Sequence, residues 1–314
     1  MTDTAPPVLL SREGAVSWIR LNRPAVLNAL DEGMAAAFRD ACRSVAEEGP
    51  GGPTRALVIA GNGRGFLAGG DVSRFNDDPA AAPEVVTAII DSLHEALRIL
   101  DRLDIPVLAS VQGPVAGAGM SLACAADLCI AADDAKFTTA YARIGATPDG
   151  SGTYNLPRLV GVRRAMELAM LADLVDAAEA LRLGLVNKVV PAAALAEETR
   201  ALAERLANGP TVAYAGIRHL LRQSWTASLD QQLDAERARF RATAGTGDFR
   251  EGIAAFLAKR KPVFRGALIA PPSQRTQRPG TRGQGSSRGT GQPCRTTSSS
   301  SAPPAPPSAV SAAA

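Results

Sequence analysis

Histidines and long apolar segments are scarce in this sequence. His94 and His219 are its only histidines, and each lies next to a leucine in a segment with helical periodicity. A histidine-rich metal centre is hard to build from two side chains, so we expect no metal site and a structural role for both. No stretch approaches 18 uninterrupted apolar residues, so we expect no membrane-spanning helix.

The four cysteines form no CxxC pair, and the two in the middle of the chain have apolar neighbours. We expect reduced thiols in a core, as in a reducing compartment. The cysteines are Cys42, Cys124, Cys129 and Cys294. Residues 1–7 lack the basic and apolar regions of a signal peptide, so we expect a cytoplasmic protein.

The net charge of +3 is a poor indicator of binding partners. Residues 266–314 contain five arginines and no acidic residue, so the rest of the chain is slightly acidic. We therefore expect no nucleic-acid partner. Pro, Ser, Gly, Thr, Arg and Ala dominate the same segment and no hydrophobic periodicity is left, which predicts a disordered, low-complexity tail.

Strand-like and helix-like segments alternate through the first part of the chain, which predicts an α/β fold with parallel strands. Apolar runs predict strands at 16–21, 55–60, 105–111, 128–132 and 185–190. Helical periodicity predicts helices at 28–45, 84–103 and 117–126, another from 149 to about 161, and mostly helices after 163.

The most informative stretch is 112–123, in which Gly113, Gly117 and Gly119 lie between a predicted strand and a predicted helix. Small residues at such a junction let a ligand approach backbone N–H groups, and a helix N-terminus favours an oxyanion or a phosphate. The spacing matches neither the P-loop nor the dinucleotide-binding motif. Tight packing of a helix against a sheet explains the stretch equally well on its own.

Three segments, in order along the chain, resemble the signatures of the crotonase (enoyl-CoA hydratase/isomerase) superfamily. They are Leu21–Pro24 with Asn28–Leu30, Phe66–Val72, and Gly113–Gly119 with Asp127. The resemblance implies a crotonase-like spiral of ββα turns and a C-terminal helical region that assembles a homotrimer or a dimer of trimers. It divides the chain into a core with the acyl-CoA site (1–195), a helical region (196–265) and the tail (266–314).

In this superfamily, two backbone N–H groups hold the thioester oxygen of an acyl-CoA and stabilise the enolate that forms there. Residue by residue, the resemblance implies Gly70 and Ala118 as these donors. Small residues at both positions also suit plain packing, which is the alternative. The implied substrate is an acyl-CoA thioester, with coenzyme A as part of the substrate and no separate cofactor.

Three side chains bear on the reaction. Hydratases of the superfamily use two glutamates, and this sequence has Ser121 and Tyr141 there, neither of which can replace a carboxylate pair. Asp149 matches the single catalytic acid of enoyl-CoA isomerases of the superfamily. The surrounding segment, residues 138–150, looks closest to the phenylacetyl-CoA branch of these isomerases. The local alternative is that Asp149 caps the helix that follows.

The resemblance also implies a set of residues that bind coenzyme A. The set is Ala68, Gly70, Asp71, Val72, Ala118, Phe256 and Lys259. Phe256 and Lys259 would reach the site from a neighbouring subunit; alternatively, Lys259 belongs to a solvated helix end. Ser73 stands where the family often has a basic residue, so Arg23 or Arg74 would have to compensate.

The sequence leaves three functions open. The favoured one is an enoyl-CoA isomerase that shifts a double bond through an oxyanion-stabilised thioester enolate, with Asp149 as acid and base. The second is another reaction of the superfamily, such as hydration or thioester hydrolysis, and the third is a non-catalytic acyl-CoA-binding subunit. Intact donors together with an acid favour an enzyme over a binding subunit.

Removal of residues 266–314 is expected to leave folding and activity nearly unchanged, because this segment has too few apolar residues to join a core. Melting temperature and turnover, compared between the truncated and the full-length protein, test the expectation. A large drop in melting temperature would show that the segment packs.

Overall fold

The computed structural model describes residues 5–77 and 79–266. Its strands are β1 (Val8–Glu13), β2 (Val16–Leu21), β3 (Ala56–Gly61), β4 (Val107–Val111), β5 (Pro114–Ala116), β6 (Leu128–Ala132), β7 (Lys136–Thr138), β8 (Val175–Asp176) and β9 (Lys188–Val190). Its α-helices are α1 (Glu32–Glu47), α2 (Val72–Asp77), α3 (Ala82–Arg102), α4 (Ala118–Ala125), α5 (Gly152–Val160), α6 (Val162–Leu171), α7 (Ala177–Leu183), α8 (Leu195–Ala207), α9 (Thr211–Gln223), α10 (Leu229–Ala244) and α11 (Gly247–Leu257).

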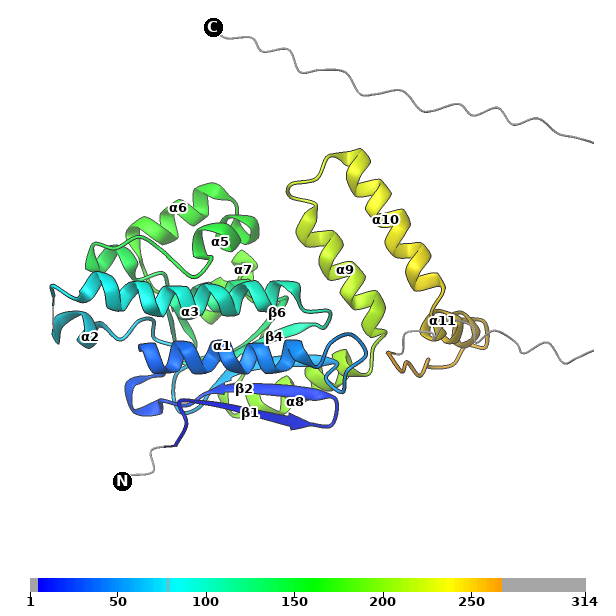
Figure 1. Cartoon of the computed structure of the whole chain (residues 1–314), viewed down its shortest axis with the longest axis horizontal. Coiled ribbons are helices and arrows are strands. Elements are labelled where there is room, and N and C mark those ends of the chain that lie inside the picture. Colours follow the sequence, from blue (N-terminus) through cyan, green and yellow to red (C-terminus); the bar gives the residue numbers. More distant parts are fainter. Residues whose placement is uncertain (1–4, 78, 267–314) are drawn as a thin grey trace, which may run out of the picture. The chain divides into compact units, whose positions relative to one another are not determined.

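Two sheets organise the described residues. The larger has the order β1-β2-β3-β4-β6-β9, in which β1 and β2 are antiparallel and every later pair is parallel. The smaller sheet has the order β5-β7-β8. Because β4 and β5, and then β6 and β7, enter the two sheets in turn, the chain winds as a spiral of repeated strand–strand–helix units (Figure 1). The predicted α/β class with parallel strands is confirmed.

Alternate residues of the large sheet serve two separate apolar layers. On one face Ile19 and Ile59 pack with the buried sides of α1 and α3. On the other face Trp18, Val58 and Leu108 pack against α8. This alternation is the period-2 pattern of strands that are covered on both faces.

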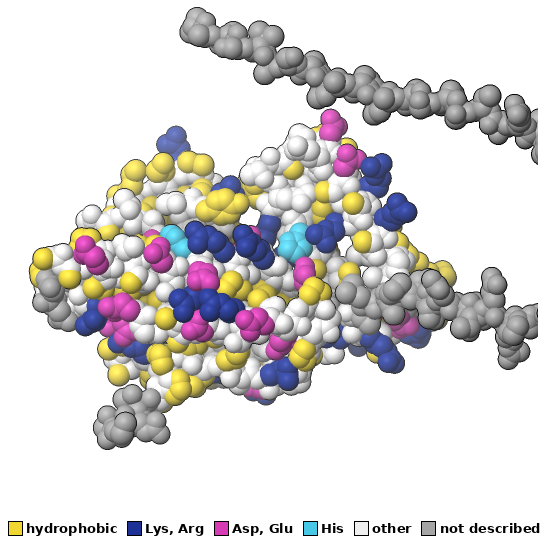
Figure 2. Space-filling view, viewed as in Figure 1, with side chains coloured by type: hydrophobic (Ala, Val, Ile, Leu, Met, Phe, Trp, Pro, Cys, Tyr) yellow, Lys and Arg dark blue, Asp and Glu magenta, His cyan; other side chains and the backbone are white. Residues whose placement is uncertain are grey.

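The outer sides of α1 and α3 are charged. Figure 2 shows Lys, Arg, Asp and Glu side chains gathered over these two helices. Arg43 of α1 pairs with Glu95 of α3 at 2.6 Å, and both side chains are largely exposed. Such exposed pairs contribute little to stability, so the two helices are held mainly by their buried faces.

Two predicted helix starts were wrong. Helix α1 begins at Glu32 rather than at Asn28, because the Asp31 side chain accepts a hydrogen bond from Met34 N and caps it. Asn28 instead lies in a turn with φ of 59°. Helix α5 begins at Gly152, three residues after the predicted start, and its capping residue Ser151 makes no side-chain cap.

The cysteine prediction is confirmed for the described thiols. Cys42, Cys124 and Cys129 are free and buried. Burial raises the pKa of all three thiols, in the case of Cys124 to about 12, so they are neutral near pH 7. Cys294 lies outside the described residues.

A buried arginine anchors the C-terminal helices. Arg218 of α9 is 6% exposed, and its Nε donates to Asp127 Oδ2 at 2.7 Å. It also donates to the carbonyl oxygens of Asp101 and Leu103 at 2.7 Å, where α3 ends. Asp127, which follows the glycine-rich motif and α4, thus holds α9 to the core through a largely desolvated ion pair with Arg218.

Hydrogen bonds hold the last described residues to α11. The backbone N–H groups of Arg265 and Gly266 donate to the carboxylate of Asp248 at 2.8 and 2.9 Å, and Asp248 is 6% exposed. The tail predicted for 266–314 otherwise lies outside the described residues. A truncation made after Gly266 would therefore keep these contacts and is the better form of the tail experiment.

Neither a membrane-spanning helix nor a metal cluster occurs in the described part of the chain. No helix in residues 5–77 and 79–266 is long and apolar enough to cross a bilayer. In the same residues no three His, Cys, Asp or Glu side chains gather as metal ligands. His219 instead contacts Asp104 Oδ1 at 2.9 Å, in keeping with its predicted structural role.

Candidate active site

Two glycine-containing segments run side by side at the centre of the spiral. Leu67 and Val115 form a parallel bridge, and Ala116 N donates to Leu67 O at 2.9 Å. Just beyond the bridge, Gly69 and Gly117 face each other with φ of 100° and 52°. A Cβ atom on Gly117 would lie 3.4 Å from Gly69 Cα. The left-handed backbone favours glycine at both positions, whereas a Cβ atom at this distance would make only an ordinary contact.

The two predicted oxyanion donors come next in both segments. Gly70 lies three residues after Leu67, and Ala118 lies three residues after Val115, so the parallel pairing brings them to the same level. Among the described residues, no acceptor is found for the N–H of Gly70 or of Ala118. Ala118 is also the first residue of α4, whose N-terminus carries partial positive charge. Both N–H groups are thus available to an oxyanion.

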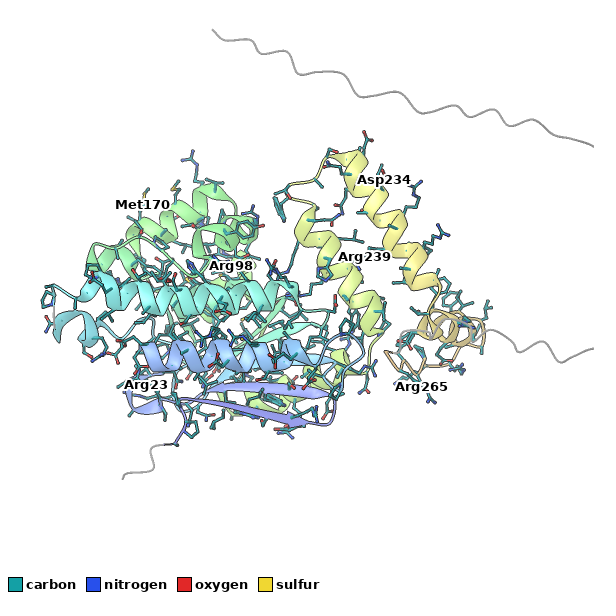
Figure 3. The ribbon with its side chains drawn as sticks, viewed as in Figure 1. Arg23, Arg98, Met170, Asp234, Arg239 and Arg265 are labelled. Carbon is teal, nitrogen blue, oxygen red and sulfur yellow. The ribbon has the colours of Figure 1, made fainter. Side chains whose placement is uncertain are left out.

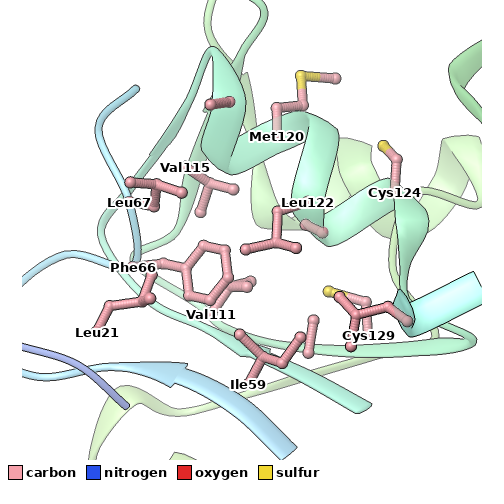
Figure 4. Close-up of a cluster of buried hydrophobic side chains, with 14 of the residues drawn as sticks. Leu21, Ile59, Phe66, Leu67, Val111, Val115, Met120, Leu122, Cys124 and Cys129 are labelled. Carbon is pink, nitrogen blue, oxygen red and sulfur yellow. The ribbon is translucent and has the colours of Figure 1, made fainter. Parts of the chain in front are cut away.

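Buried side chains hold this arrangement from below. Figure 4 shows Phe66, Leu67 and Val115 packed under α4 with Leu122. Phe66 is fully buried, and Leu67 and Leu122 are almost so. The segment that carries Gly70 is therefore fixed to the helix that carries Ala118 by apolar contacts as well as by the backbone bridge.

Asn28 is a second support that sequence reasoning did not assign. Its side chain is completely buried, and Nδ2 lies 2.9–3.1 Å from the carbonyl oxygens of Asn62, Gly65 and Phe66. The side chain thus ties the loop before Gly70 to the N-terminal motif. Asn28 lies in the segment Asn28–Leu30 that resembles a family signature, which marked the residue, but nothing local in the sequence indicated its partners.

Asp149 is held by polar contacts from three elements. Tyr141 Oη donates to Asp149 Oδ1 at 2.5 Å. Ser121 Oγ of α4 donates to the Asp149 carbonyl oxygen at 3.0 Å, and His94 Nε2 of α3 accepts from Gly150 N at 3.2 Å. Ser121 and Tyr141, which the resemblance puts in the positions of the hydratase glutamates, therefore both contact Asp149, the first at its backbone and the second at its carboxylate.

The hypothesis that Asp149 caps a helix is wrong. The first backbone N–H groups of α5 are not bonded to its carboxylate, and only its carbonyl oxygen accepts from Gly152 N, at 2.9 Å. The carboxylate contacts Tyr141 instead. The side chain of Asp149 is therefore not required to start the helix and is free for chemistry.

Tyr141 links the acid to the oxyanion donors. Burial, and next the negative charge of Asp149, raise the pKa of its phenol, which therefore stays protonated as a donor. A Cβ atom on Gly117 would lie 3.8 Å from Tyr141 Cζ, which places the ring beside the residue that precedes Ala118. The acid, the phenol and one N–H donor thus occupy a single site.

An apolar cavity of about 260 Å³ extends from this site between α4, α5 and α6. Most of its lining is aliphatic, and Ser121, Thr139, Tyr141 and Thr153 provide the hydroxyl groups. The full lining is Met120, Ser121, Cys124, Thr139, Tyr141, Pro148, Gly152, Thr153, Leu156, Pro157, Val162, Ala165, Met166 and Ala169. The cavity adjoins the site through Ser121 and Tyr141 and is suited to an apolar group.

Asp71 is occupied by structural contacts. Ser73 Oγ donates to Asp71 Oδ1 at 2.6 Å, and Arg23 pairs with Asp71 Oδ2 at 3.2 Å. These two contacts, Ser73 first, lower the pKa of the Asp71 carboxyl. Arg23 lies near the start of α1 and also pairs with Asp31 at 3.0 Å (Figure 3). Its charge is largely neutralised, which makes it a weak candidate for a phosphate contact.

The other predicted CoA-binding residues divide into two groups. Ala68 lies on the loop before α2, and the exposed Val72 is the first residue of that helix, so the two lie on either side of Gly70 in the sequence. Phe256 and Lys259 lie in and after α11, which Figure 1 places at the end of the described part opposite to α2. Within one chain these two residues do not reach the site. Arg74, the second candidate for compensation, pairs with Glu32 at 3.1 Å and is half exposed.

Gly119→Ala is expected to destabilise the protein by about 1–3 kcal/mol, because the new Cβ atom would lie 2.1 Å from Leu67 O and would force the two segments apart. Urea unfolding at a fixed protein concentration measures the change. Gly33→Ala in α1 is the matched control, since its Cβ atom would meet Asp31 Oδ1 at an ordinary 3.6 Å. Equal stability of the two variants would contradict the close approach of the segments.

Comparisons with known proteins agree with this geometry. The family model for enoyl-CoA hydratase/isomerase matches residues 11–267. The 1,2-epoxyphenylacetyl-CoA isomerase of Escherichia coli K12 is 38% identical over 260 residues, which cover 82% of this chain and 98% of the relative. A probable enoyl-CoA hydratase of Rhodobacter capsulatus is 40% identical over 249 residues, which cover 79% of this chain and 93% of the relative.

A solved structure gives the same result for the fold. The crystal structure of an enoyl-CoA hydratase from Polaromonas sp. JS666 matches with a TM-score of 0.77 at 36% identity, and the match covers 82% of this chain and 99% of that one. The predicted crotonase fold is thus confirmed. Taken with the family match, the solved structure shows that the chain belongs to the enoyl-CoA hydratase/isomerase family and is an enzyme of that family.

Proposed function

We propose that this protein is an enoyl-CoA isomerase in which Asp149 moves the proton. The observation that carries the proposal is the placement of a single carboxylate at the site, with Ser121 and Tyr141 in the positions of the two hydratase glutamates. A pair of carboxylates that could grip and activate water is missing from these positions. One acid beside an oxyanion site suits a proton shift better than the addition of water.

The reaction needs one base and one charge-stabilising site. The Asp149 carboxylate takes a proton from C2 of a 3-enoyl thioester, and the electrons of the C–H bond move into the enolate, whose oxygen faces the N–H groups of Gly70 and Ala118. The same carboxyl returns the proton to C4, and the double bond then lies between C2 and C3. Each preorganised donor is worth about 3–4 kcal/mol. The atoms and electrons of this double-bond shift balance without water or a redox partner.

The apolar cavity supports a substrate with a bulky or cyclic acyl group. A dry protein cavity of about 150 Å³ holds benzene. The cavity of about 260 Å³ is larger, so a ring with several further carbon atoms fits. The relative named 1,2-epoxyphenylacetyl-CoA isomerase points in the same direction. An aromatic-derived acyl-CoA is therefore the first substrate class to test.

Assembly into a homotrimer, or a dimer of trimers, would complete the CoA site. The chain carries two apolar surfaces, one on α6 and one on α10 and α11. The α6 surface is formed by Val162, Met166, Met170 and Leu171, and the C-terminal surface by Leu233, Phe240, Ile253, Phe256 and Leu257, all at least 47% exposed. Two different surfaces suit a head-to-tail ring. Val162 and Met166 also line the cavity, so a neighbour seated on α6 would bring its Phe256 and Lys259 towards the site.

Asp149→Asn is expected to lower isomerisation by about 10²–10⁴-fold, because the amide keeps the shape but cannot accept the proton. The assay offers a panel of 3-enoyl-CoA and 2-enoyl-CoA thioesters and identifies the products by mass spectrometry and NMR. Isomerisation leaves the mass unchanged, whereas hydration adds a water. Binding of acyl-CoA, measured by calorimetry, should persist because backbone N–H groups hold the thioester oxygen.

Ser121→Ala is the matched control for this experiment. It removes the α4 hydroxyl that donates to the Asp149 carbonyl oxygen but leaves the carboxylate, so it should cost far less turnover. Retained isomerisation in Asp149→Asn, or hydration as the main reaction of the unchanged protein, would sink the proposal. Absence of any turnover over the whole panel would favour a non-catalytic acyl-CoA-binding subunit.

Light scattering at micromolar concentration is expected to give the mass of three or six chains. Met170→Glu, which places a charge on the exposed α6 surface, should dissociate the assembly. Leu10→Glu on β1, where the leucine is 44% exposed, is the control that should leave the mass unchanged. A monomer in the unchanged protein would contradict both the assembly and the assignment of Phe256 and Lys259.

A further inference from the structure

We propose that Tyr141 is a positioning residue that reserves one oxygen of Asp149 for proton transfer. Its hydroxyl occupies Oδ1, so Oδ2 alone takes the proton from C2 and returns it to C4. This inference rests on the proposed function, and it assigns a role to a side chain that sequence reasoning treated only as a missing glutamate.

Hydrogen bonds hold the backbone of Tyr141 on both its N–H and its carbonyl side. Tyr141 opens a 3-10 turn (Tyr141–Ile144), and Ala140 before it has φ of 60°. Tyr141 N donates to Thr139 O at 2.8 Å, and Ala146 N donates to Tyr141 O at 3.0 Å. The hydroxyl therefore approaches Asp149 from a defined direction rather than from a mobile loop.

The other groups near Asp149 are already occupied. Ser121 Oγ donates to the carbonyl oxygen of Asp149, and His94 accepts from Gly150 N. Within residues 5–77 and 79–266, Tyr141 is the donor found on the carboxylate. Of the titratable groups, Tyr141 and His94 are hydrogen-bonded to this loop, and the buried Cys124 lines the adjoining cavity with its pKa raised to about 12.

A donor on a carboxylate has two physical effects. It favours the ionised form, so the base stays available at lower pH. It also occupies the lone pairs of one oxygen and fixes the plane of the carboxyl group. Because burial and the Asp149 charge keep the phenol protonated, the donor is present over the whole range in which the enzyme would work. A proton that moves between C2 and C4 on one face needs a single carrier atom in one place.

Tyr141→Phe should move the acidic limb of the pH profile of kcat/KM upward by about one to two pH units, because it removes a hydrogen bond to a charged group. The kcat on the plateau should fall, but less than in Asp149→Asn, and KM should change little. Steady-state rates of the purified full-length protein between about pH 4 and pH 9, the range in which carboxyl and imidazole groups titrate, give all three values.

The matched control is Tyr154→Phe. Tyr154 lies on α5, is 49% exposed and stacks with Arg158, whose Cζ is 3.6 Å from the ring centre. It does not line the cavity, so its hydroxyl should have no influence on the acidic limb. A purely structural effect of losing a tyrosine hydroxyl would lower the rate without moving the limb.

Replacement of Tyr141 by 3-fluorotyrosine tests the same point without removing the ring. The fluorinated phenol is a stronger donor, so the acidic limb should move to lower pH, opposite to the shift in Tyr141→Phe. This variant also decides the question if Tyr141→Phe does not fold. An unmoved limb in the fluorotyrosine protein overturns the role of Tyr141.

The outcomes separate this inference from the proposed function. If Asp149→Asn is inactive and the pH profile of Tyr141→Phe superimposes on that of the unchanged protein, the role of Tyr141 is wrong and the isomerase proposal stands. If Asp149→Asn retains isomerisation, both are wrong. Opposite shifts of the limb in the two Tyr141 variants, with none in Tyr154→Phe, support the inference.

Discussion

The close approach of two backbone segments, at Gly69 and Gly117, is the constraint on which the site depends. Both residues have left-handed backbone that favours glycine, and the pairing of Leu67 with Val115 just before them brings Gly70 and Ala118 level. The fold builds this contact from strand ends of successive spiral turns, and apolar packing holds it in place. Backbone donors fixed in this way need no reorganisation when charge develops on a bound oxygen.

The polar contacts around Asp149 are secondary to that constraint but give the site its chemical character. Ser121 donates to the carbonyl oxygen of Asp149 and Tyr141 donates to its carboxylate, and neither hydroxyl adds a second carboxylate to the site. A lone carboxylate in a partly buried site avoids the repulsion that a second carboxylate would impose on its ionised form. Ser121 and Tyr141 contribute hydrogen-bond donors placed beside Asp149, not acid groups.

Much of the fold could be predicted from the sequence, because long amphipathic helices and apolar strands have a clear period. Strands 16–21 and 128–132 were predicted with their observed bounds. The smaller sheet was missed because β5, β7 and β8 have two or three residues each, too few to show a period. The edge strand β1 is mostly exposed and likewise lacks a strong pattern.

The site was only partly predictable, for a different physical reason. The resemblance to the family signatures implied Gly70 and Ala118 as the oxyanion donors, and the left-handed backbone of the neighbouring Gly69 and Gly117 explains why glycine stands beside them. The contacts of Asn28 and Tyr141 depend on tertiary neighbours that no local pattern encodes. Asp149 shows the limit most clearly: Pro-Asp-Gly indicates a turn or a helix cap, and only the distance to Tyr141 Oη shows that its carboxylate is engaged elsewhere. Local rules fail here because a tertiary contact rather than the helix engages the carboxylate, and such a conflict is a reason to test Asp149 for function.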